Sequence, residues 1–531
     1  MSNKITVCIL TAGKGTRMGP IGTNLSKALH PLGDKAIISH IIESFPKNSE
    51  FVIGVGFLSK QVKNYLKMAH EKTKFTFVNI KNYDGIGSGP GHSLSCCKKY
   101  LQKPFYFVSC DTLWDNKINF KIKSNWLGVS RVKDKETKNY CNVKLENNRI
   151  TDVLDKKFTS DRKYKAFVGL CFIKDYKIFW KGIESKILIN GENQISNGIK
   201  YLIDNSNTVG LKINWTDIGD KDKYEQAIKK YANYDFSKTD EALYILNKKV
   251  IKFFVDPQII RLRYKKSKLN RKVFPHIDHL SEQFYSYKFQ SGKTLYENNN
   301  EKIFIALLNW LSKNLWKKGK KINKNINQAC LDFYKNKTLK RIELFHKKYK
   351  NYNKSLLINN KKIPAISALI KKVDWKSLSN GIPTFIHGDL QFDNILHDGN
   401  KNSFTLLDWR QDFAGDVRIG DIYYDLAKLY GGILINYDYI KLNLFYYSEK
   451  YNEIEYDFAI RKKMENYKKI FQVFIKKNSY DFKKVCILTS LIYLNMSPLH
   501  KYPFDKLLYA HGKSMLYNEI NNINNWYGQT E

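Results

Sequence analysis

The chain has 531 residues, with 90 Lys and Arg against 50 Asp and Glu, so its formal net charge is +40. Hydrophobic residues make up 43% and charged residues 26%, which excludes a disordered tail and predicts several compact units. A charge of this size attracts polyanions, but the lysines are spread along the chain and no known nucleic-acid-binding motif accompanies them. We therefore expect no specific nucleic-acid partner, and keep a basic nucleic-acid-binding protein as the alternative from another class.

Cysteine usage and hydropathy predict the compartment. The eight cysteines include no C-x-x-C pair, which favours a reducing environment. No apolar run approaches the roughly 20 residues that a membrane span needs. We expect a cytoplasmic protein without a membrane span, and the sequence leaves its oligomeric state open.

The first part of the chain alternates short apolar runs with helical patterns. Residues 36–45 place isoleucines at helical spacing between two of these runs. Strand–helix–strand alternation predicts a mainly parallel sheet that is covered on both faces, a Rossmann-like α/β domain over residues 1–234. The predicted strands are residues 5–11, 51–57, 75–80, 105–110 and 166–173.

The pattern changes after residue 235, and segment 227–241 is the best candidate boundary between domains. Residues 242–246 and 250–254 flank a polar turn and predict an antiparallel hairpin, with a further strand at 283–290. From residue 301 onward the chain is mostly helical, with short strands expected at 384–387 and 404–407. This organisation predicts a small lobe over 235–297 and a helical lobe over 298–531.

The first predicted strand runs into a glycine-rich segment, residues 10–19, which reads LTAGKGTRMG. Glycines at a strand end allow backbone N–H groups to approach phosphate oxygens. Met18 stands where the dinucleotide-binding fingerprint requires its third glycine, so that motif is excluded. Lys14, Arg17 and the following Lys27 instead supply cations that suit a leaving pyrophosphate.

Two aspartates follow apolar segments of this first domain. Asp111 ends the run VSCD at residues 108–111, and Asp217 lies in WTDIG at residues 215–219. Carboxyl ends of strands are where open α/β sheets bind ligands. A pair of carboxylates there can hold a Mg²⁺ ion that also contacts triphosphate oxygens.

Together these segments resemble the nucleoside-triphosphate transferase family, which includes the sugar-phosphate and choline-phosphate nucleotidyltransferases. Residues 10–18 match its L-x-A-G-x-G-T-R-M signature, and residues 87–91, GSGPG, look like its base-binding segment. The resemblance implies that a phosphomonoester oxygen attacks the α-phosphorus of a nucleoside triphosphate, while Arg17 and Lys27 stabilise the growing negative charge. It also implies nucleotide binding by Leu10, Ala12, Gly13, Gly15, Thr16, Gly87 and Ser88, substrate-phosphate binding by Lys156, and Mg²⁺ binding by Asp111 and Asp217.

A second motif lies near residue 390, where residues 385–396 read FIHGDLQFDNIL and residues 406–409 read LLDW. An Asp five residues before an Asn, followed by an Asp that ends an apolar strand, is the order of phosphoryl-transfer residues in kinases. In this interpretation Asp389 accepts the proton of an attacking hydroxyl. Asn394 and Asp408 hold Mg²⁺ against the ATP phosphates.

This second segment resembles the aminoglycoside phosphotransferase and choline kinase family. Residues 420–429, GDIYYDLAKL, look like its supporting helix, with Asp425 expected to brace the catalytic loop. Lys252 fits the strand lysine that pairs with ATP phosphates. Two departures concern the ATP clamp: residues 236–239 replace a glycine-rich loop, and residues 257–270 offer no acidic partner to Lys252.

The two halves suggest consecutive steps. We expect ATP-dependent phosphorylation of a small alcohol, an amino alcohol, polyol or sugar, followed by nucleotidyl transfer from a second nucleoside triphosphate, with CTP as the first guess. Such products are precursors of cell-surface polysaccharides or lipids. Arg410 beside Trp409 would repel a quaternary ammonium. This single residue does not decide the acceptor, so choline-like and sugar-like acceptors are both kept, with equal weight. In the alternative, only the nucleotidyltransferase half is active and the kinase half is degenerate.

Overall fold

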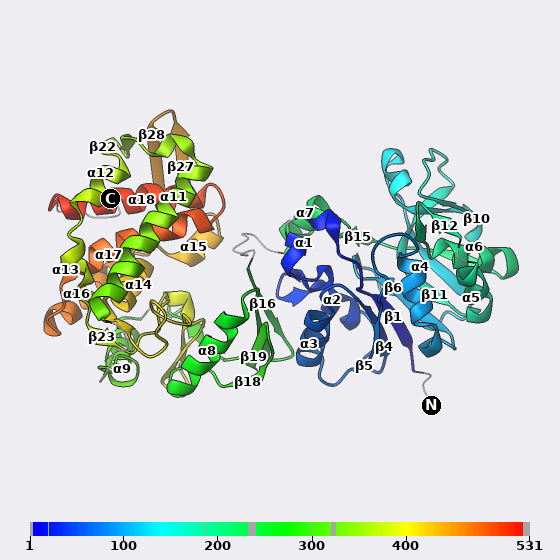
Figure 1. Cartoon of the computed structure of the whole chain (residues 1–531), viewed down its shortest axis with the longest axis horizontal. Helices are drawn as coiled ribbons and strands as arrows, with labels where there is room; N and C mark the ends of the chain where they lie inside the picture. Colours follow the sequence, from blue (N-terminus) through cyan, green and yellow to red (C-terminus); the bar gives the residue numbers. More distant parts are fainter. Residues whose placement is uncertain are drawn as a thin grey trace. The chain divides into compact units, whose positions relative to one another are not determined.

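The computed structural model describes residues 4–19, 21–185, 187–231, 240–298, 300–319 and 325–523. The chain forms two compact units, one of Met1–Val255 with His279–Ser286 and one of Asp256–Asp278 with Tyr287–Glu531. Both units are drawn in Figure 1. The expected boundary at residue 234 lies outside the described residues. Within the described ranges, no helix combines the length and the apolar character needed to cross a membrane.

The first unit is built on a sheet of nine strands in the order β5-β4-β1-β6-β11-β8-β14-β10-β9. Strands β5, β4, β1 and β6 pair in parallel, as predicted. Strand β11 pairs antiparallel with β6 and with β8, so the complete sheet is mixed. The strands are β1 (Thr6–Leu10), β4 (Glu50–Val55), β5 (Lys74–Asn79), β6 (Phe105–Ser109), β8 (Asn125–Ser130), β9 (Cys141–Glu146), β10 (Arg149–Asp155), β11 (Tyr164–Ile173) and β14 (Thr208–Lys212).

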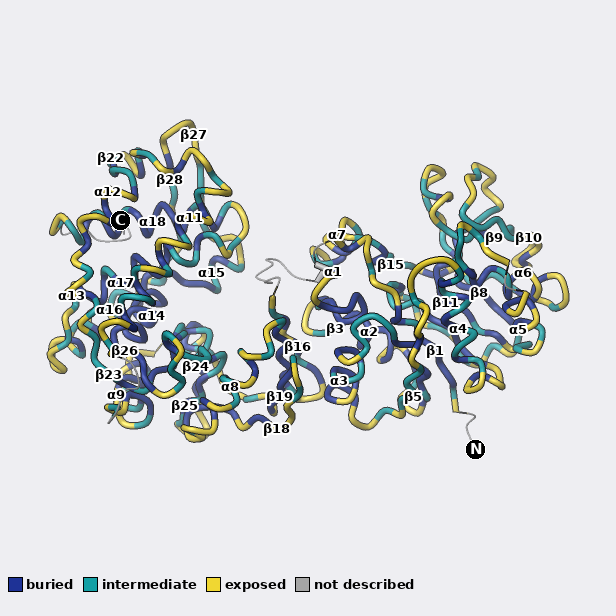
Figure 2. The backbone as a smooth tube through the Cα atoms, viewed as in Figure 1, coloured by how far each residue is buried: buried dark blue, intermediate teal, exposed yellow. Residues whose placement is uncertain are grey.

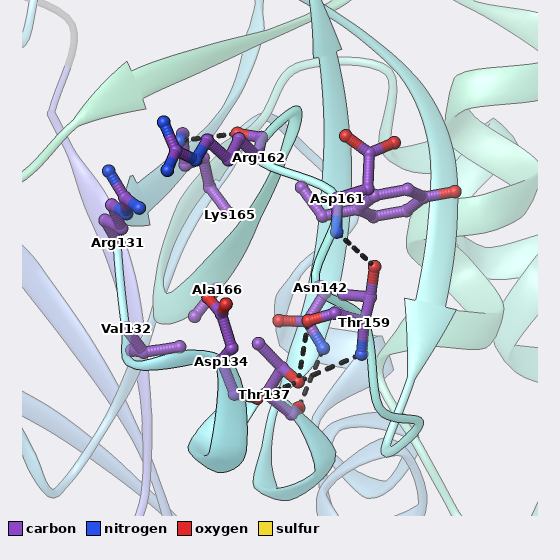
Figure 3. Close-up of a pocket in the computed structure, with 11 residues that line it drawn as sticks. Arg131, Val132, Asp134, Thr137, Asn142, Thr159, Asp161, Arg162, Lys165 and Ala166 are labelled. Carbon is purple, nitrogen blue, oxygen red and sulfur yellow. Dashed lines mark hydrogen bonds between the residues drawn. The ribbon is translucent and has the colours of Figure 1, made fainter.

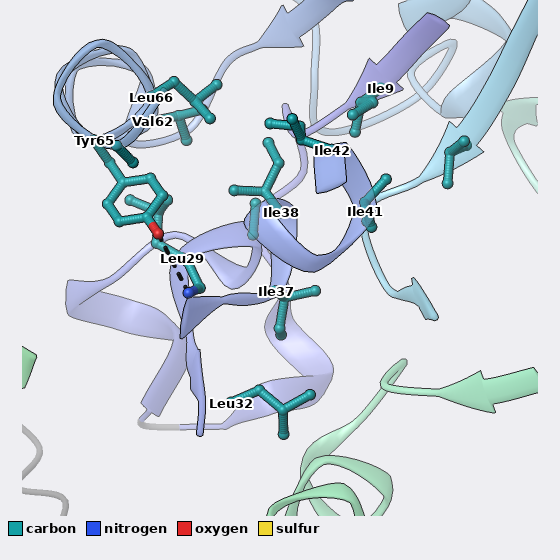
Figure 4. Close-up of a cluster of buried hydrophobic side chains, with 14 of the residues drawn as sticks. Ile9, Leu29, Leu32, Ile37, Ile38, Ile41, Ile42, Val62, Tyr65 and Leu66 are labelled. Carbon is teal, nitrogen blue, oxygen red and sulfur yellow. Dashed lines mark hydrogen bonds between the residues drawn. The ribbon is translucent and has the colours of Figure 1, made fainter. Parts of the chain in front are cut away.

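Both faces of this sheet are covered by helices. Alternate residues of β1 point to opposite faces, so Val7 and Ile9 join one hydrophobic cluster and Cys8 joins the other. The first cluster includes α2 (Ile37–Glu43) and α3 (Ser59–Ala69), whose apolar side chains are drawn in Figure 4. The second includes α4 (Pro90–Cys96), α5 (Tyr176–Glu184) and α6 (Ser196–Asn205).

A small four-stranded sheet, in the order β16-β17-β19-β18, contains the predicted hairpin. The Tyr244 ring lies 4.8 Å from the Tyr65 ring of α3, and its hydroxyl donates to the Leu29 carbonyl at 2.6 Å. The expectation grouped the hairpin with the second domain, whereas its packing places it in the first unit. The strands are β16 (Glu241–Leu246), β17 (Lys249–Phe254), β18 (Ile277–Leu280) and β19 (Phe284–Lys288).

The second unit is mainly helical around one central helix. Every residue of α14 (Ile422–Leu434) is buried, and Figure 2 shows this helix in the colour of buried residues. Asp421 caps its N-terminus by accepting from the Tyr423 amide at 3.2 Å. The other described helices are α8 (Pro257–Leu269), α9 (Glu301–Asn314), α10 (Ile326–Leu331), α11 (Lys337–Lys348), α12 (Ile366–Lys372), α13 (Trp375–Ser379), α15 (Tyr437–Lys441), α16 (Met464–Lys477), α17 (Phe482–Met496) and α18 (Phe504–Ile520).

The short strands of the second unit carry and flank its main motif. Strand β24 (Ile395–Asp398) pairs antiparallel with β25 (Ser403–Leu406), and the turn between them separates Asn394 from Asp408. A further sheet in the order β22-β21-β28-β27 was not anticipated, because its longer strands carry polar residues at most positions and leave a weak hydrophobic pattern. These strands are β21 (Leu356–Ile358), β22 (Lys361–Ile363), β27 (Phe445–Lys450) and β28 (Glu453–Phe458).

Candidate active sites

In the first unit, the glycine-rich segment turns directly after β1. Gly15 adopts the left-handed conformation with φ of 65°, which an L-residue reaches only with strain. A Cβ atom at Gly15 would lie 3.3 Å from the Cβ of Lys27, so the turn packs closely over that lysine. Gly13, Thr16 and Arg17 are exposed, which leaves the outer side of this turn open to a ligand.

Lys27 connects the turn to the first predicted metal residue. Its ammonium donates to Asp111 Oδ2 at 2.7 Å and to the Gly219 carbonyl at 3.0 Å. Burial opposes ionisation of Asp111, but the attraction of Lys27 and then Arg17 outweighs it, so the pKa of Asp111 lies below its usual value. A cation and a carboxylate therefore face each other beneath the glycine turn.

Asp217, the second predicted metal residue, lies next to Asp111 through strand pairing. Strand β15 (Trp215–Asp217) pairs with β7 (Thr112–Trp114), and this register sets Asp217 opposite Thr112. The Ile218 amide donates to the Asp111 carbonyl at 3.0 Å. The fold thus brings together two aspartates that are more than one hundred residues apart in the chain.

Sequence reasoning missed the two side chains that hold Asp217. Lys223 Nζ lies 2.6 Å from Asp217 Oδ2, and the Tyr140 hydroxyl donates to the same oxygen at 2.7 Å. Burial lowers the pKa of Lys223, and the larger combined influence of Asp217 and Tyr140 raises it above its usual value. Each predicted Mg²⁺ carboxylate of this unit is therefore paired with a lysine of the same chain.

The predicted base-binding and substrate-phosphate residues converge on one hairpin, β12–β13 (Leu188–Ile189 and Glu192–Asn193). The Gly87 amide donates to the Gly191 carbonyl at 2.8 Å, and the Asn193 amide donates to the Ser88 carbonyl at 2.7 Å. Lys156, with a positive φ of 50°, donates to Glu192 Oε2 at 3.2 Å. Strained backbone of this kind is concentrated at functional sites.

A separate pocket in this unit is too small for a substrate (Figure 3). Its volume is about 10 Å³, which is room for one water molecule. The Thr137 hydroxyl donates to the Thr159 carbonyl at 3.2 Å and accepts from the Thr159 amide at 3.1 Å, which ties its walls together.

In the second unit, Asp425 holds the loop that carries Asp389. Its carboxylate accepts from the amides of His387 at 2.8 Å and Gly388 at 2.7 Å, and from the Trp316 indole at 3.0 Å. These contacts place Asp425 where the sequence predicted it, against the loop that carries Asp389. Because α14 is buried all round, the loop is anchored to the packed core of the unit.

Asp389 emerges from this loop with its carboxylate 36% exposed and pairs with Lys428 of α14 at 2.7 Å. Burial raises its pKa, but attraction to Lys428 lowers it further, so the pKa of Asp389 lies below its usual value. The Asn394 side-chain amide donates to the Asp389 carbonyl at 2.9 Å, which fixes the spacing of the two residues. The Leu407 amide donates to the Asn394 carbonyl at 2.7 Å, so Asn394 and Asp408 lie close together.

Asp408 has a positive φ of 54° and forms an ion pair with Arg263 of α8. The neighbouring Trp409 is completely buried and donates to the Arg263 carbonyl at 2.9 Å. One turn further along α8, Lys266 donates to the carbonyls of Arg410 at 2.8 Å and His387 at 3.3 Å. Helix α8, in which the sequence showed no acidic residue, instead provides two basic side chains to the loops that carry Asp389 and Asp408.

Lys252, the predicted ATP-phosphate lysine, is buried on β17. Strand β17 belongs to the first unit, whereas Asp389, Asn394 and Asp408 belong to the second. The predicted glycine-loop replacement at residues 236–239 lies outside the described residues.

The donor sets of both sites suit Mg²⁺. Within the described part of the chain, no three His, Cys, Asp or Glu side chains gather into a metal-binding group. Mg²⁺ is typically bound by one or two carboxylates and completes its octahedron with water and substrate phosphates. Asp111 with Asp217, and Asp408 with Asn394, are donor sets of this hard oxygen type.

Comparison with known families identifies two transferase domains in this chain. Residues 7–117 match the family described as MobA-like NTP transferase domain, and residues 334–441 match the family described as phosphotransferase enzyme family. The chain therefore joins a nucleotidyltransferase domain to a phosphotransferase domain of the aminoglycoside phosphotransferase type, as the motifs predicted.

Curated relatives match the first part of the chain. The bifunctional protein GlmU of Methanococcus vannielii is 30% identical over 222 residues, which are 40% of this chain and 51% of that protein. GlmU of Methanocaldococcus jannaschii is 28% identical over 215 residues, 40% of this chain and 50% of that protein. The chain thus spans about half the length of the curated relatives it matches.

Two solved structures show a limited similarity to this chain. A UDP-glucose pyrophosphorylase in complex with UDP-glucose has 19% identity and a TM-score of 0.38, covering 43% of this chain and 98% of that chain. An inositol-1-phosphate CTP transferase from T. maritima has 16% identity and a TM-score of 0.35, covering 43% of this chain and 96% of that chain.

Proposed function

We propose that this chain is a bifunctional enzyme that phosphorylates a small alcohol and then activates the phosphate as a nucleoside diphosphate derivative. The main support is that each unit holds an acidic site of the expected composition. In the second unit, Asp389 stands on a loop anchored by Asp425. In the first, strand pairing sets Asp217 opposite Thr112, the residue next to Asp111, and the Ile218 amide donates to the Asp111 carbonyl.

In the kinase step, the acceptor hydroxyl oxygen attacks the γ-phosphorus of ATP, the bond to the β,γ-bridging oxygen breaks and ADP leaves. Asp389 accepts the hydroxyl proton, a role that fits a carboxylate whose pKa lies below its usual value and which is ionised at neutral pH. Asn394 and Asp408 would hold Mg²⁺, which supplies charge neutralisation on the phosphates. Lys252 remains our candidate for an ATP-phosphate contact.

In the nucleotidyl-transfer step, a phosphate oxygen of the first product attacks the α-phosphorus of a nucleoside triphosphate and pyrophosphate leaves. Lys27 and Arg17 stabilise the charge that develops on the reacting phosphates. Lys156 orients the attacking phosphate, and Gly87 and Ser88 contact the base. Asp111 and Asp217 would hold Mg²⁺ at this site, in place of their present ion pairs with Lys27 and Lys223.

The acceptor class is an amino alcohol, a polyol or a sugar, and CTP is the first nucleotide to test. The test is a screen of acceptors with ATP and each nucleoside triphosphate in the presence of Mg²⁺, followed by phosphorus NMR. Asp389→Asn should remove the monoester-forming step by a factor of roughly 10²–10⁴ and leave nucleotidyl transfer to added monoester intact. Asp111→Ala should do the opposite.

Matched controls remove aspartates outside the two sites. Asp115 is half exposed in a surface pair with Lys230, and Asp457 is exposed on β28. Asp115→Ala and Asp457→Asn should leave both activities unchanged. If Asp389→Asn or Asp111→Ala removes both activities while the protein stays folded, the two-site proposal is wrong. Nucleotidyl transfer without any kinase turnover would favour the alternative of a degenerate kinase half.

A further inference from the structure

An open pocket lies along one side of α11 in the second unit, with a volume of about 540 Å³. A pocket of this size suits a small metabolite. None of the site residues assigned above lines it. Cationic side chains dominate its lining. The residues that line it are Asp332, Asn336, Lys337, Lys340, Arg341 and Leu344.

The Phe333 ring connects this pocket to the catalytic loop. The ammonium of Lys337 lies 4.3 Å from the centre of that ring, and the guanidinium of Arg410 lies 4.8 Å from it. Arg410 is fixed beside the catalytic loop, because its amide donates to the His387 carbonyl at 3.0 Å. A Cβ atom at Gly388 would lie only 2.6 Å from the Cβ of Arg410, so this side chain starts right beside the residue that precedes Asp389.

The cations of this cluster repel one another. Burial lowers the pKa of Lys337 well below its usual value, and Arg410, Lys428 and Arg341 lower it further. Burial and then Arg410 lower the pKa of Arg341. Lys337 and Arg410 approach the same Phe333 ring, and Arg341 lines the pocket one helical turn beyond Lys337.

Few carboxylates balance this charge. Among the described residues, no ion pair joins Lys337, Arg341 or Arg410 to an acidic side chain, whereas Lys428 is paired with Asp389. Asp332 lines the pocket, and its Oδ1 accepts from the side-chain amides of Gln328 and Asn336, both at 3.0 Å. Unbalanced cations in a concave site raise the local concentration of anions and bind them strongly.

We propose that the phosphoryl acceptor of the second unit carries an anionic group of its own, a carboxylate or a phosphate, which binds Arg341, Lys337 and Arg410 while its hydroxyl reaches Asp389. This inference rests on the proposed kinase function and narrows its acceptor class. A cationic amino alcohol such as choline would meet repulsion at this cluster. A sugar acid, a hydroxy acid or a sugar phosphate would relieve the repulsion among the cations.

The test compares acceptors that differ only in the anionic group. ADP release is measured with glucose, glucuronate and glucose 6-phosphate, and with glycerol and glycerate, so that carboxylate and phosphate are separated. We expect an anionic member to exceed its neutral partner at least tenfold in kcat/KM. Arg341→Gln should abolish most of this preference through a higher KM for the acceptor, without changing the KM for ATP.

Two variants control this experiment. Arg341→Lys keeps the charge and should retain much of the preference, which separates lost charge from lost folding. Lys347→Gln removes a charge from the same helix, where the 69% exposed Lys347 pairs with Glu343 at 2.9 Å, and should change nothing.

The outcomes distinguish the inference from the function on which it rests. Equal use of neutral and anionic acceptors, or a rise in the KM for ATP alone in Arg341→Gln, overturns the inference and leaves the kinase standing. If ADP is not released with any acceptor, the kinase proposal fails. In that case, thermal stabilisation of the protein by glucuronate or glucose 6-phosphate that is lost in Arg341→Gln would still support an anion-binding site. If neither compound stabilises the protein, the anion-binding site is overturned as well.

Discussion

The ammonium of Lys428 lies 2.7 Å from Oδ1 of Asp389, so the proposed catalytic base is neutralised by a lysine from the central helix of its own unit. The side chain of Lys428 is only 9% exposed, and burial of its charge is offset by this one carboxylate. The pair keeps Asp389 ionised in an environment that would otherwise favour its protonated form. It also fixes where the carboxylate points.

Replacing Lys428 should therefore change the pH dependence of the kinase step. In Lys428→Met the attraction that lowers the pKa of Asp389 is lost, and burial and Asp408 then raise it. Because the base must be ionised, the acidic limb of the kcat/KM profile should move to higher pH, and the rate on that limb should fall. Lys428→Arg should keep the acidic limb of the profile at its original pH. If the limb of folded Lys428→Met does not move, Lys428 does not control the pKa of Asp389.

Lys27 should matter for nucleotidyl transfer alone. Lys27→Met removes the cation beside Asp111 and the reacting phosphates, and we expect a loss of roughly 10²–10³ in kcat. Release of pyrophosphate measures this step, and ADP release measures the other. Lys35→Met is the matched control, because Lys35 pairs with Glu43 at the surface. A parallel fall in both activities would indicate that Lys27 acts on folding.

Tyr140 should position Asp217. Tyr140→Phe removes the hydroxyl that donates to Asp217 at 2.7 Å, and a hydrogen bond to a charged group contributes about 1.5–3 kcal/mol. We expect the Mg²⁺ concentration for half-maximal nucleotidyl transfer to rise several-fold. Tyr164→Phe removes another tyrosine–aspartate contact of the same unit, to Asp152, and should leave the Mg²⁺ titration unchanged. An unaltered titration in Tyr140→Phe would limit this tyrosine to packing.

Buried Lys266 should make stability depend on pH. Burial lowers its pKa from 10.5 to about 7, so between these values the unfolded chain binds more protons than the folded one. The free energy of unfolding should therefore rise with pH from about 7 to 10.5, by at most about 1.4 kcal/mol per pH unit from this group. Below about pH 7, Lys266 is protonated in both the folded and the unfolded chain, so its destabilising contribution no longer changes with pH.

Urea unfolding of the full chain at several pH values measures this slope. Lys266→Met should flatten it, while the loss of contacts to the carbonyls of His387 and Arg410 adds an offset that does not vary with pH. Lys265→Met replaces the exposed neighbour on the same helix and should retain the slope. Identical slopes in wild type and Lys266→Met would contradict the assignment.

Local sequence signals were sufficient for the strands that lead into the two motifs of the first unit. The apolar runs that form β1 and β6 mark strands whose carboxyl ends lead to Gly13 and Asp111. Asp425 could be predicted because its helix follows the catalytic loop in a recognisable motif. In these cases the functional side chain stands at a fixed offset from the pattern that reveals it.

The counter-ions could not be predicted. Arg263 pairs with Asp408 across 145 residues, and nothing distinguishes it from the other 89 of the 90 Lys and Arg residues before the chain is folded. The hairpin of β16 and β17 was assigned to the wrong side of the division for a similar reason, because the contact of Tyr244 with Tyr65 is tertiary. Contacts between residues far apart in the chain form only on folding, so patterns in a single sequence do not reveal which residues pair.

The presence of both units on one polypeptide has a consequence for cellular supply. Each copy that is translated provides one phosphotransferase domain and one nucleotidyltransferase domain, so their molar ratio is always one to one. Expression level cannot tune one step against the other. Accumulation or depletion of the intermediate monoester would then be governed by the turnover numbers of the two sites and by the supply of ATP relative to the second nucleotide.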